Sequence, residues 1–170
     1  MKKIIFTAIC LLLSTGNVFG QIQEEPKYKL NPSVDKESPA GIYIPKDLED
    51  CFKELRTMLA PALIEEMKSG TESDMNKYHR SLGMWLRNNW GLWSDSRLKK
   101  YFNDIGIHHP DDMSGIILTS FWRHLNNKPI QLQDQISYYR QYWKDMETDK
   151  EKNHKAETPT QESRVTQEGQ

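Results

Sequence analysis

The chain has 170 residues, of which 36% are hydrophobic and 28% are charged, and its formal net charge is −1. This length fits one folded domain and is too short for two. No cluster of basic residues marks a nucleic-acid-binding surface, so the sequence predicts no nucleic-acid partner. No segment has the roughly 20 consecutive apolar residues that a membrane-spanning helix needs, so no membrane span is expected.

The first 20 residues have the pattern of an export signal. Two lysines precede a run of about ten mostly apolar residues from Ile4 to Leu13, and Val18-Phe19-Gly20 places small residues at the positions that a signal peptidase reads. The pattern predicts cleavage before Gln21. We therefore expect a protein that is exported, either to the periplasm or into the medium.

Residues 21–41 contain three prolines among polar and charged residues, without a sustained period, and are predicted to be a linker. Helical periodicity begins near residue 42. A first helix from Pro45 would bury Cys51, which after cleavage is the only cysteine and is expected to be a small core residue rather than a nucleophile. A second helix is predicted from Pro61 to a stop at Gly70.

The segment from Leu82 to Trp93, LGMWLRNNWGLW, holds three of the five tryptophans. On a regular helical wheel its apolar side chains continue the face of Met75 and Tyr78, with Asn89 near the middle of that face and Arg87 on the opposite side. A buried Asn must be hydrogen-bonded, so one hypothesis makes Asn89 a polar latch of the core. The other hypothesis is a ligand site, for which the candidate residues are Arg87, Asn88, Asn89, Trp90 and Trp93.

A further helix is predicted from Ser96 to Gly106, followed by His108-His109-Pro110-Asp111-Asp112. Two histidines and two aspartates in five residues resemble a metal site. However, Pro at the first helical position with acidic residues behind it is typical of helix initiation. No second cluster of His or carboxylate residues supports a metal. We predict no metal and no cofactor, and keep these as candidate binding residues: His108, His109, Asp111 and Asp112.

The next helix is predicted from Pro110 to Leu125, with His124 on or beside the core and His79 on the flank of the preceding helix. Both are interpreted as packing histidines. A last amphipathic segment carries Leu132, Ile136, Tyr139 and Trp143 on one face and is expected to dock on the bundle or on a partner. Residues 146–170 are too polar to bury much surface and are predicted to form a disordered tail.

Together these elements predict an all-α fold, a compact bundle of about five to six short helices over residues 42–145, between a disordered N-terminal linker and a disordered C-terminal tail. The motif pair GMWLRNNWGLW and GIHHPDDMSGIIL, with Trp122-Arg123-His124-Leu125 behind it, resembles an uncharacterised bacterial domain-of-unknown-function family. The resemblance covers roughly residues 43–130. It implies an all-helical domain and brings no activity.

Two functions remain open from the sequence. The first is a non-enzymatic module that binds a protein or a glycan through exposed Trp and Tyr side chains. The second is a hydrolase-like or metal-dependent enzyme that uses the His-His-Pro-Asp-Asp turn, which requires His108 or His109 to converge with Arg87 and Asn88 in a concave pocket. Short connections further predict that the tryptophan-rich segment meets this turn, with Arg87 paired to Asp111 or Asp112. The sequence does not indicate an oligomeric state.

Overall fold

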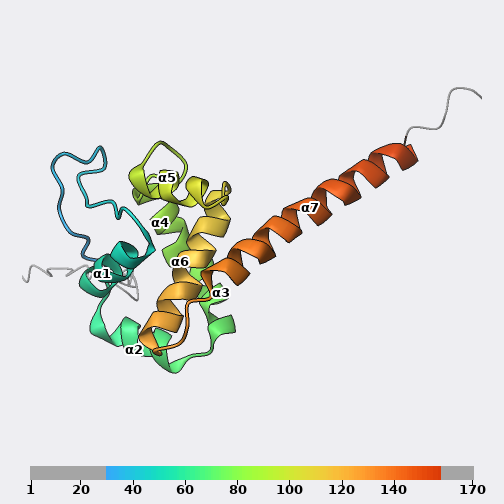
Figure 1. The fold of residues 1–170 in the computed structure, drawn as a ribbon. Coiled ribbons are helices and arrows are strands. Elements are labelled where there is room, and N and C mark those ends of the chain that lie inside the picture. The colour runs from blue at the N-terminus through green and yellow to red at the C-terminus, as the bar shows by residue number, and fades with distance from the viewer. Residues whose placement is uncertain (1–29, 158–170) are drawn as a thin grey trace, which may run out of the picture.

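The computed structural model describes residues 30–157, so the predicted signal peptide, the start of the linker and residues 158–170 lie outside the described part of the chain. The fold is helical (Figure 1), which confirms the predicted fold class. Within the described residues the only strand-like pairing is an isolated bridge between Val34 and Ile42. The α-helices are α1 Leu48–Met58, α2 Pro61–Ser69, α3 Met75–Tyr78, α4 Met84–Asn89, α5 Arg97–Asp104, α6 Pro110–Leu125 and α7 Leu132–Glu157.

Helix α6 runs through the middle of the bundle, and the other α-helices pack against it (Figure 1). Its side chains Met113, Ile116, Ile117 and Phe121 are fully buried. A helix that is apolar around most of its circumference must be covered on all sides. The shorter helices therefore surround α6 and bury its apolar surface, which is the centre of the core.

Capping residues set the helix boundaries. The Asp47 side chain accepts a hydrogen bond of 2.8 Å from the Asp50 backbone N–H, so α1 begins at Leu48 rather than at the predicted Pro45. Ser96 caps α5 in the same way. Pro110 occupies the first position of α6 with two aspartates behind it, which confirms that the His-His-Pro-Asp-Asp sequence initiates a helix.

The tryptophan-rich segment is not one regular helix, because a π-helical turn, His79–Gly83, separates α3 from α4. A π turn holds more residues than the 3.6 of an α-helical turn and rotates every later side chain around the axis. Arg87 is consequently buried, with 8% of its surface exposed. Asn89 is only half-buried and donates to the Trp85 carbonyl of its own helix at 2.8 Å. The predictions that Asn89 lies mid-core and that Arg87 faces away from the core are wrong for this reason.

The described part of the predicted linker lies against α1. The backbone N–H and the hydroxyl of Ser33 donate to the two carboxylate oxygens of Glu54, at 2.7 and 2.8 Å, and the Glu54 side chain is buried. The backbone N–H of Asn31 donates to the carbonyl of Met58 at 2.9 Å. These contacts attach the chain to the bundle from Leu30 onward, upstream of the domain start predicted at residue 42.

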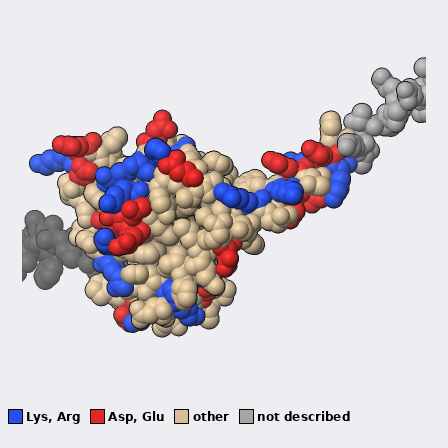
Figure 2. Space-filling model, in the orientation of Figure 1, with Lys and Arg blue, Asp and Glu red and all other residues tan. Residues whose placement is uncertain are grey.

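Helix α7 docks on α6 only through its first half and then projects from the bundle (Figure 1). The docking face carries Ile136, Tyr139 and Trp143, and the same face continues with charged and polar residues, so no apolar surface holds the second half. The helix nevertheless extends to Glu157, past the predicted boundary at residue 145. Charged side chains of both signs are interspersed along it (Figure 2). Pairs such as Lys152 with Asp149, 3.3 Å apart, support an exposed helix.

Cys51 and His124 have the structural roles that the sequence predicts. Cys51 is fully buried, and burial raises the pKa of its thiol well above the ordinary value. His124 stacks on Phe52 with ring centroids 4.7 Å apart, and partial burial lowers its pKa. Among the helices of residues 30–157, none is both long and apolar enough to cross a membrane.

Candidate functional site

Arg87 joins the tryptophan-rich segment to the start of α6. Its Nε atom lies 3.2 Å from Oδ1 of Asp111, and its Nη1 atom donates to Oγ of Ser114 at 2.8 Å. The predicted meeting of the two motifs, with Arg87 paired to an aspartate of the turn, is confirmed. The Arg87 side chain is 10% exposed and the Asp111 side chain is 39% exposed, so this charge-assisted pair is screened less by water than a fully exposed surface pair.

His79 completes this cluster from the π turn. Its Nε2 atom lies 3.1 Å from the carbonyl oxygen of Asp111 and 3.2 Å from Oγ of Ser114. In a Ser-His-Asp triad the serine and the carboxylate contact opposite nitrogens of the imidazole ring. Here Nε2 also makes the 4.0 Å approach to the Asp111 carboxylate, and Ser114 is fully buried. The cluster therefore has the geometry of a clamp between the π turn and α6, and not that of a proton relay.

Gly83 allows this close packing. A Cβ atom at residue 83 would lie 3.2 Å from Nη1 of Arg87 and 3.5 Å from the Leu118 side chain of α6. The glycine thus leaves room for the Arg87 side chain to cross the π turn toward Ser114. This is a close approach that any larger residue would hinder.

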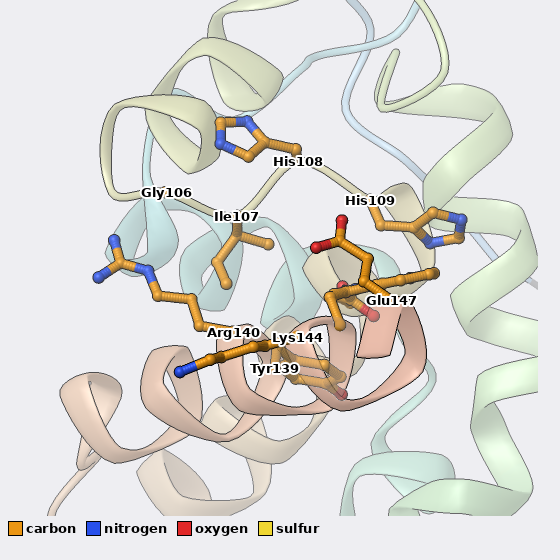
Figure 3. A pocket seen from close by; sticks show the side chains of 10 residues that line it. Gly106, Ile107, His108, His109, Tyr139, Arg140, Lys144 and Glu147 are labelled. Carbon is orange, nitrogen blue, oxygen red and sulfur yellow. The ribbon is translucent and has the colours of Figure 1, made fainter. Parts of the chain in front are cut away.

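A pocket of about 630 Å³ opens beside the clamp, between the Gly106–Pro110 turn and α7 (Figure 3). We call it the Trp143 pocket. The turn and the first residues of α6 form one wall, and one face of α7 forms the other. The lining residues are Gly106, Ile107, His108, His109, Asp112, Tyr139, Arg140, Trp143, Lys144 and Glu147.

Aromatic side chains gather at one end of the Trp143 pocket. The ring of His109 lies between Trp93, with centroids 6.2 Å apart, and Trp143, with centroids 5.1 Å apart. Trp93 is 55% exposed and Trp143 is 36% exposed. Tyr142, which is also exposed, packs edge-on against Trp143. Trp93, His109 and Trp143, which come from three separate parts of the chain, thus form one aromatic surface, and this surface is open to solvent.

Asp112 and Tyr139 form the buried back of the pocket. The indole Nε1 of Trp143 donates to Oδ2 of Asp112 at 2.6 Å, and Asp112 is only 7% exposed. Burial raises the pKa of this carboxyl group, although the hydrogen bond from Trp143 opposes that shift. Burial raises the pKa of Tyr139 to about 12, so this phenol is protonated at neutral pH.

The charged residues of α7 differ in their partners. Arg140 crosses Gly106, which has a φ of 81°, and its Nη2 atom donates to the carbonyl of Ile105 at 2.9 Å. A side chain at residue 106 would both strain this backbone and displace Arg140. Lys144 and Glu147 line the pocket and make no ion pair with any side chain that the structure describes.

The structure distributes these predicted candidates over four environments: the Trp143 pocket, the clamp, the exposed surface and the core. His108, His109 and Asp112 line the Trp143 pocket, and Trp93 stands at its aromatic end. Arg87 and Asp111 form the clamp. Asn88 is exposed and does not line this pocket, whereas Trp90 is fully buried and so is removed from contact with any ligand. The Trp143 pocket therefore does not bring His108 or His109 together with Arg87 and Asn88, the convergence that the hydrolase-like hypothesis requires.

The contribution of α7 to the pocket is not predicted from the sequence. The apolar pattern predicts that Tyr139 and Trp143 dock, but it does not indicate Arg140, Lys144 and Glu147 as site residues. Their spacing of four and three residues, which places them on one helical face, is the signal that was available. Among the described residues no three side chains of His, Cys, Asp or Glu are placed to hold a metal ion.

Gly115 offers a test of how α7 is held. A Cβ atom there would overlap the hydroxyl of Tyr139, so Gly115→Ala should push the docked half of α7 outward at a cost of about 1–3 kcal/mol. Hydrogen exchange of residues 132–143 should accelerate about tenfold. Adding Tyr139→Phe, which removes the overlapping oxygen, should restore most of the protection. Unchanged exchange in Gly115→Ala would show that α7 does not rest on this surface.

The comparisons with known proteins give a family without an activity. Residues 44–125 match the model of a family described as Domain of unknown function (DUF6794). This finding confirms the expected resemblance to an uncharacterised domain family. The matched segment contains the whole clamp and ends before α7. No curated protein and no solved structure matches the chain.

Proposed function

We propose that this helical domain, whose core matches a domain of unknown function, is an exported, non-enzymatic module that binds a peptide segment in the Trp143 pocket. The observation that carries the proposal is the exposed aromatic surface around His109, formed by Trp93 and Trp143. Exposed aromatic rings give a large contact area at a low cost in conformational entropy. The pocket volume also falls in the range of about 300–1,000 Å³ that is usual for ligand sites.

The charges of the pocket favour a peptide over a neutral glycan. Lys144 and Glu147 line the pocket without an ion-pair partner among the described residues. A neutral sugar offers no charged group to either side chain, so their desolvation on binding would be uncompensated. A peptide or protein segment carries ammonium, guanidinium and carboxylate groups that pair with them.

The hydrolase-like alternative has less support from the geometry. The described residues that line the Trp143 pocket include no Ser, Thr or Cys that could act as a nucleophile. The Nδ1 atom of His109 accepts the Asp111 backbone N–H at 3.3 Å as a helix cap, so its function is already structural. A water-mediated reaction would still need a base at His108, whose Nδ1 atom lies 3.3 Å from Oδ1 of Asn103.

Peptide display selection tests the proposed function. A random peptide library panned against the purified domain should enrich a recurrent sequence. The enriched peptides should bind the Trp93→Ala/Trp143→Ala double variant at least tenfold more weakly, because aromatic anchors of binding sites contribute about 2 kcal/mol or more each. Met84→Ala, which truncates another exposed apolar side chain outside the pocket, is the control and should bind normally. Enrichment of sugars alone on a glycan array would contradict the proposal.

Export is tested separately on the full chain. Expressed with its native N-terminus in a bacterial host, the protein should be recovered outside the cytoplasm with a mature N-terminus at Gln21, as read by intact mass and N-terminal sequencing. Replacing Leu11 and Leu12 by Lys, which interrupts the apolar run, should retain the unprocessed chain in the cytoplasm. Processing at the same position in that variant would contradict the proposal.

A further inference from the structure

The α7 wall of the Trp143 pocket carries charges of opposite sign at its two ends. Arg140, Lys144 and Glu147 follow one another at spacings of four and three residues, so they share one face of the helix. In Figure 3 Arg140 lies beside Gly106 and the Glu147 carboxylate lies toward His109, while the Lys144 side chain extends to the side of Arg140. Both ends open on the same pocket.

These side chains do not neutralise one another. Lys144 and Glu147 are spaced suitably for an ion pair along the helix, yet no such pair forms, and Arg140 uses Nη2 on the Ile105 carbonyl while the rest of its guanidinium stays available. The partly exposed ring of Trp143, on the same face of the helix, supplies an apolar surface. A ligand that satisfies this arrangement has an anionic group and a cationic group separated by an apolar part.

We propose that the Trp143 pocket binds a short peptide with two free ends, a proposal that rests on the peptide-binding function above. The carboxylate of the peptide pairs with Arg140 and Lys144, and its ammonium group pairs with Glu147. An apolar side chain of the peptide packs on the exposed part of the Trp143 ring. Arginine suits the first contact because its planar group can bind a carboxylate through two parallel hydrogen bonds.

The experiment uses the tripeptide Ala-Phe-Ala and three derivatives, followed through the Trp143 indole N–H signal in NMR titrations of the mature domain. The derivatives are the N-acetylated peptide, the C-amidated peptide and the peptide with both ends blocked. Removing either terminal charge should weaken binding about fivefold, the effect of one partly exposed ion pair. The doubly blocked peptide should bind most weakly.

Variants assign each end of the peptide to its protein partner. Glu147→Gln should weaken the free peptide about fivefold and leave the N-acetylated peptide unaffected, because that peptide has already lost the ammonium partner. Lys144→Gln should likewise weaken binding of the free peptide about fivefold and leave binding of the C-amidated peptide unaffected. Lys150→Gln, on the projecting half of α7, is the matched control and should change nothing.

Two results would overturn the inference. One is an Ala-Phe-Ala titration that leaves the Trp143 signal unmoved, and the other is equal binding of all four peptides. If displayed peptides with internal sequences still bind in a Trp143-dependent manner, the proposed peptide-binding function stands and only the recognition of free ends is wrong. If neither the displayed peptides nor the tripeptides bind, both proposals fail.

Discussion

Arg87→Ala should lower the free energy of unfolding by about 2–4 kcal/mol, the largest effect expected from a polar substitution in this domain. The change removes the 3.2 Å ion pair with Asp111 and the 2.8 Å hydrogen bond to Ser114, and it leaves a cavity where the buried side chain lay. Asp111 keeps 39% of its side chain exposed, so water partly replaces the lost partner. For that reason the expected cost stays below that of breaking a fully buried pair. Urea denaturation followed by circular dichroism measures it.

Three further variants identify the cause of the loss. Asn88→Ala alters the exposed neighbour of Arg87 and should cost less than about 0.5 kcal/mol. Arg87→Met keeps most of the side-chain volume and removes the charge. The free energy of unfolding that it loses beyond the Asn88→Ala control therefore reports the ion pair rather than the cavity. Ser114→Ala should couple with Arg87→Ala in a double-mutant cycle. An Arg87→Ala variant as stable as Asn88→Ala would show that the clamp does not form in solution.

The helix boundaries could be predicted where local chemistry determines them. Pro110 and the two following aspartates initiate α6 at the predicted residue. Proline lacks a backbone N–H, which has no partner within the helix at this position, and negative charge in the first turn is favourable at a helix N-terminus. Gly106 has the left-handed backbone expected at the end of α5. Such signals depend on a few neighbouring residues and need no knowledge of the tertiary structure.

The clamp shows where the helical wheel fails. The short connections of the chain predict that Arg87 pairs with Asp111 or Asp112, and the structure selects Asp111, yet the helical wheel placed Arg87 opposite the core. The π turn at His79–Gly83 reverses that assignment, and its stabilisation comes from contacts with α6 that are remote in sequence. A local pattern does not report such a change of helical register.

The Trp143 pocket depends on a docking register that the sequence leaves open. The apolar stripe of α7 predicts that Tyr139 and Trp143 face a partner, but it does not specify whether that partner is α6 or another molecule. Gly115 and Asp112 determine the position, since the first makes room for Tyr139 and the second accepts the indole N–H of Trp143. The charged lining from Arg140 to Glu147 follows from this docking.

Trp143→Phe should destabilise the docked half of α7 by about 1–3 kcal/mol at neutral pH, because the buried Asp112 carboxylate loses the indole N–H that donates to it at 2.6 Å. Hydrogen exchange of residues 132–143 would show the loss as faster exchange, while the exchange of α6 below them changes less. Tyr142→Phe, an equally conservative change on the exposed side of the same helix, is the control and should leave exchange unchanged. In an Asp112→Leu background, Trp143→Phe should cost much less, since no carboxylate is left unpaired.

The pH dependence provides the sharper test of this contact. Burial raises the pKa of Asp112 in the folded domain above the ordinary value of 3.8, so the folded state binds this proton more tightly than the unfolded state does. The stability that the group contributes is fully present below its unfolded pKa and is lost as the pH rises through its folded pKa. The side chain of the Asp112→Asn variant does not titrate and keeps an oxygen that accepts the indole N–H. The stability of this variant should therefore decline less than that of the wild type as the pH rises.

His79, His109 and Asp111 also face Asp112 and are present in both proteins, so the difference between variant and wild type isolates the Asp112 carboxyl group. Trp143→Phe should steepen the decline instead, because the hydrogen bond from the indole lowers the pKa of Asp112 and its removal lets the pKa rise further. Urea midpoints measured from about pH 3 to pH 7 would separate the two variants by the opposite signs of their slopes relative to wild type. Parallel curves for all three proteins would mean that Asp112 is hydrated rather than covered by Trp143, and α7 would then not form the wall of the pocket.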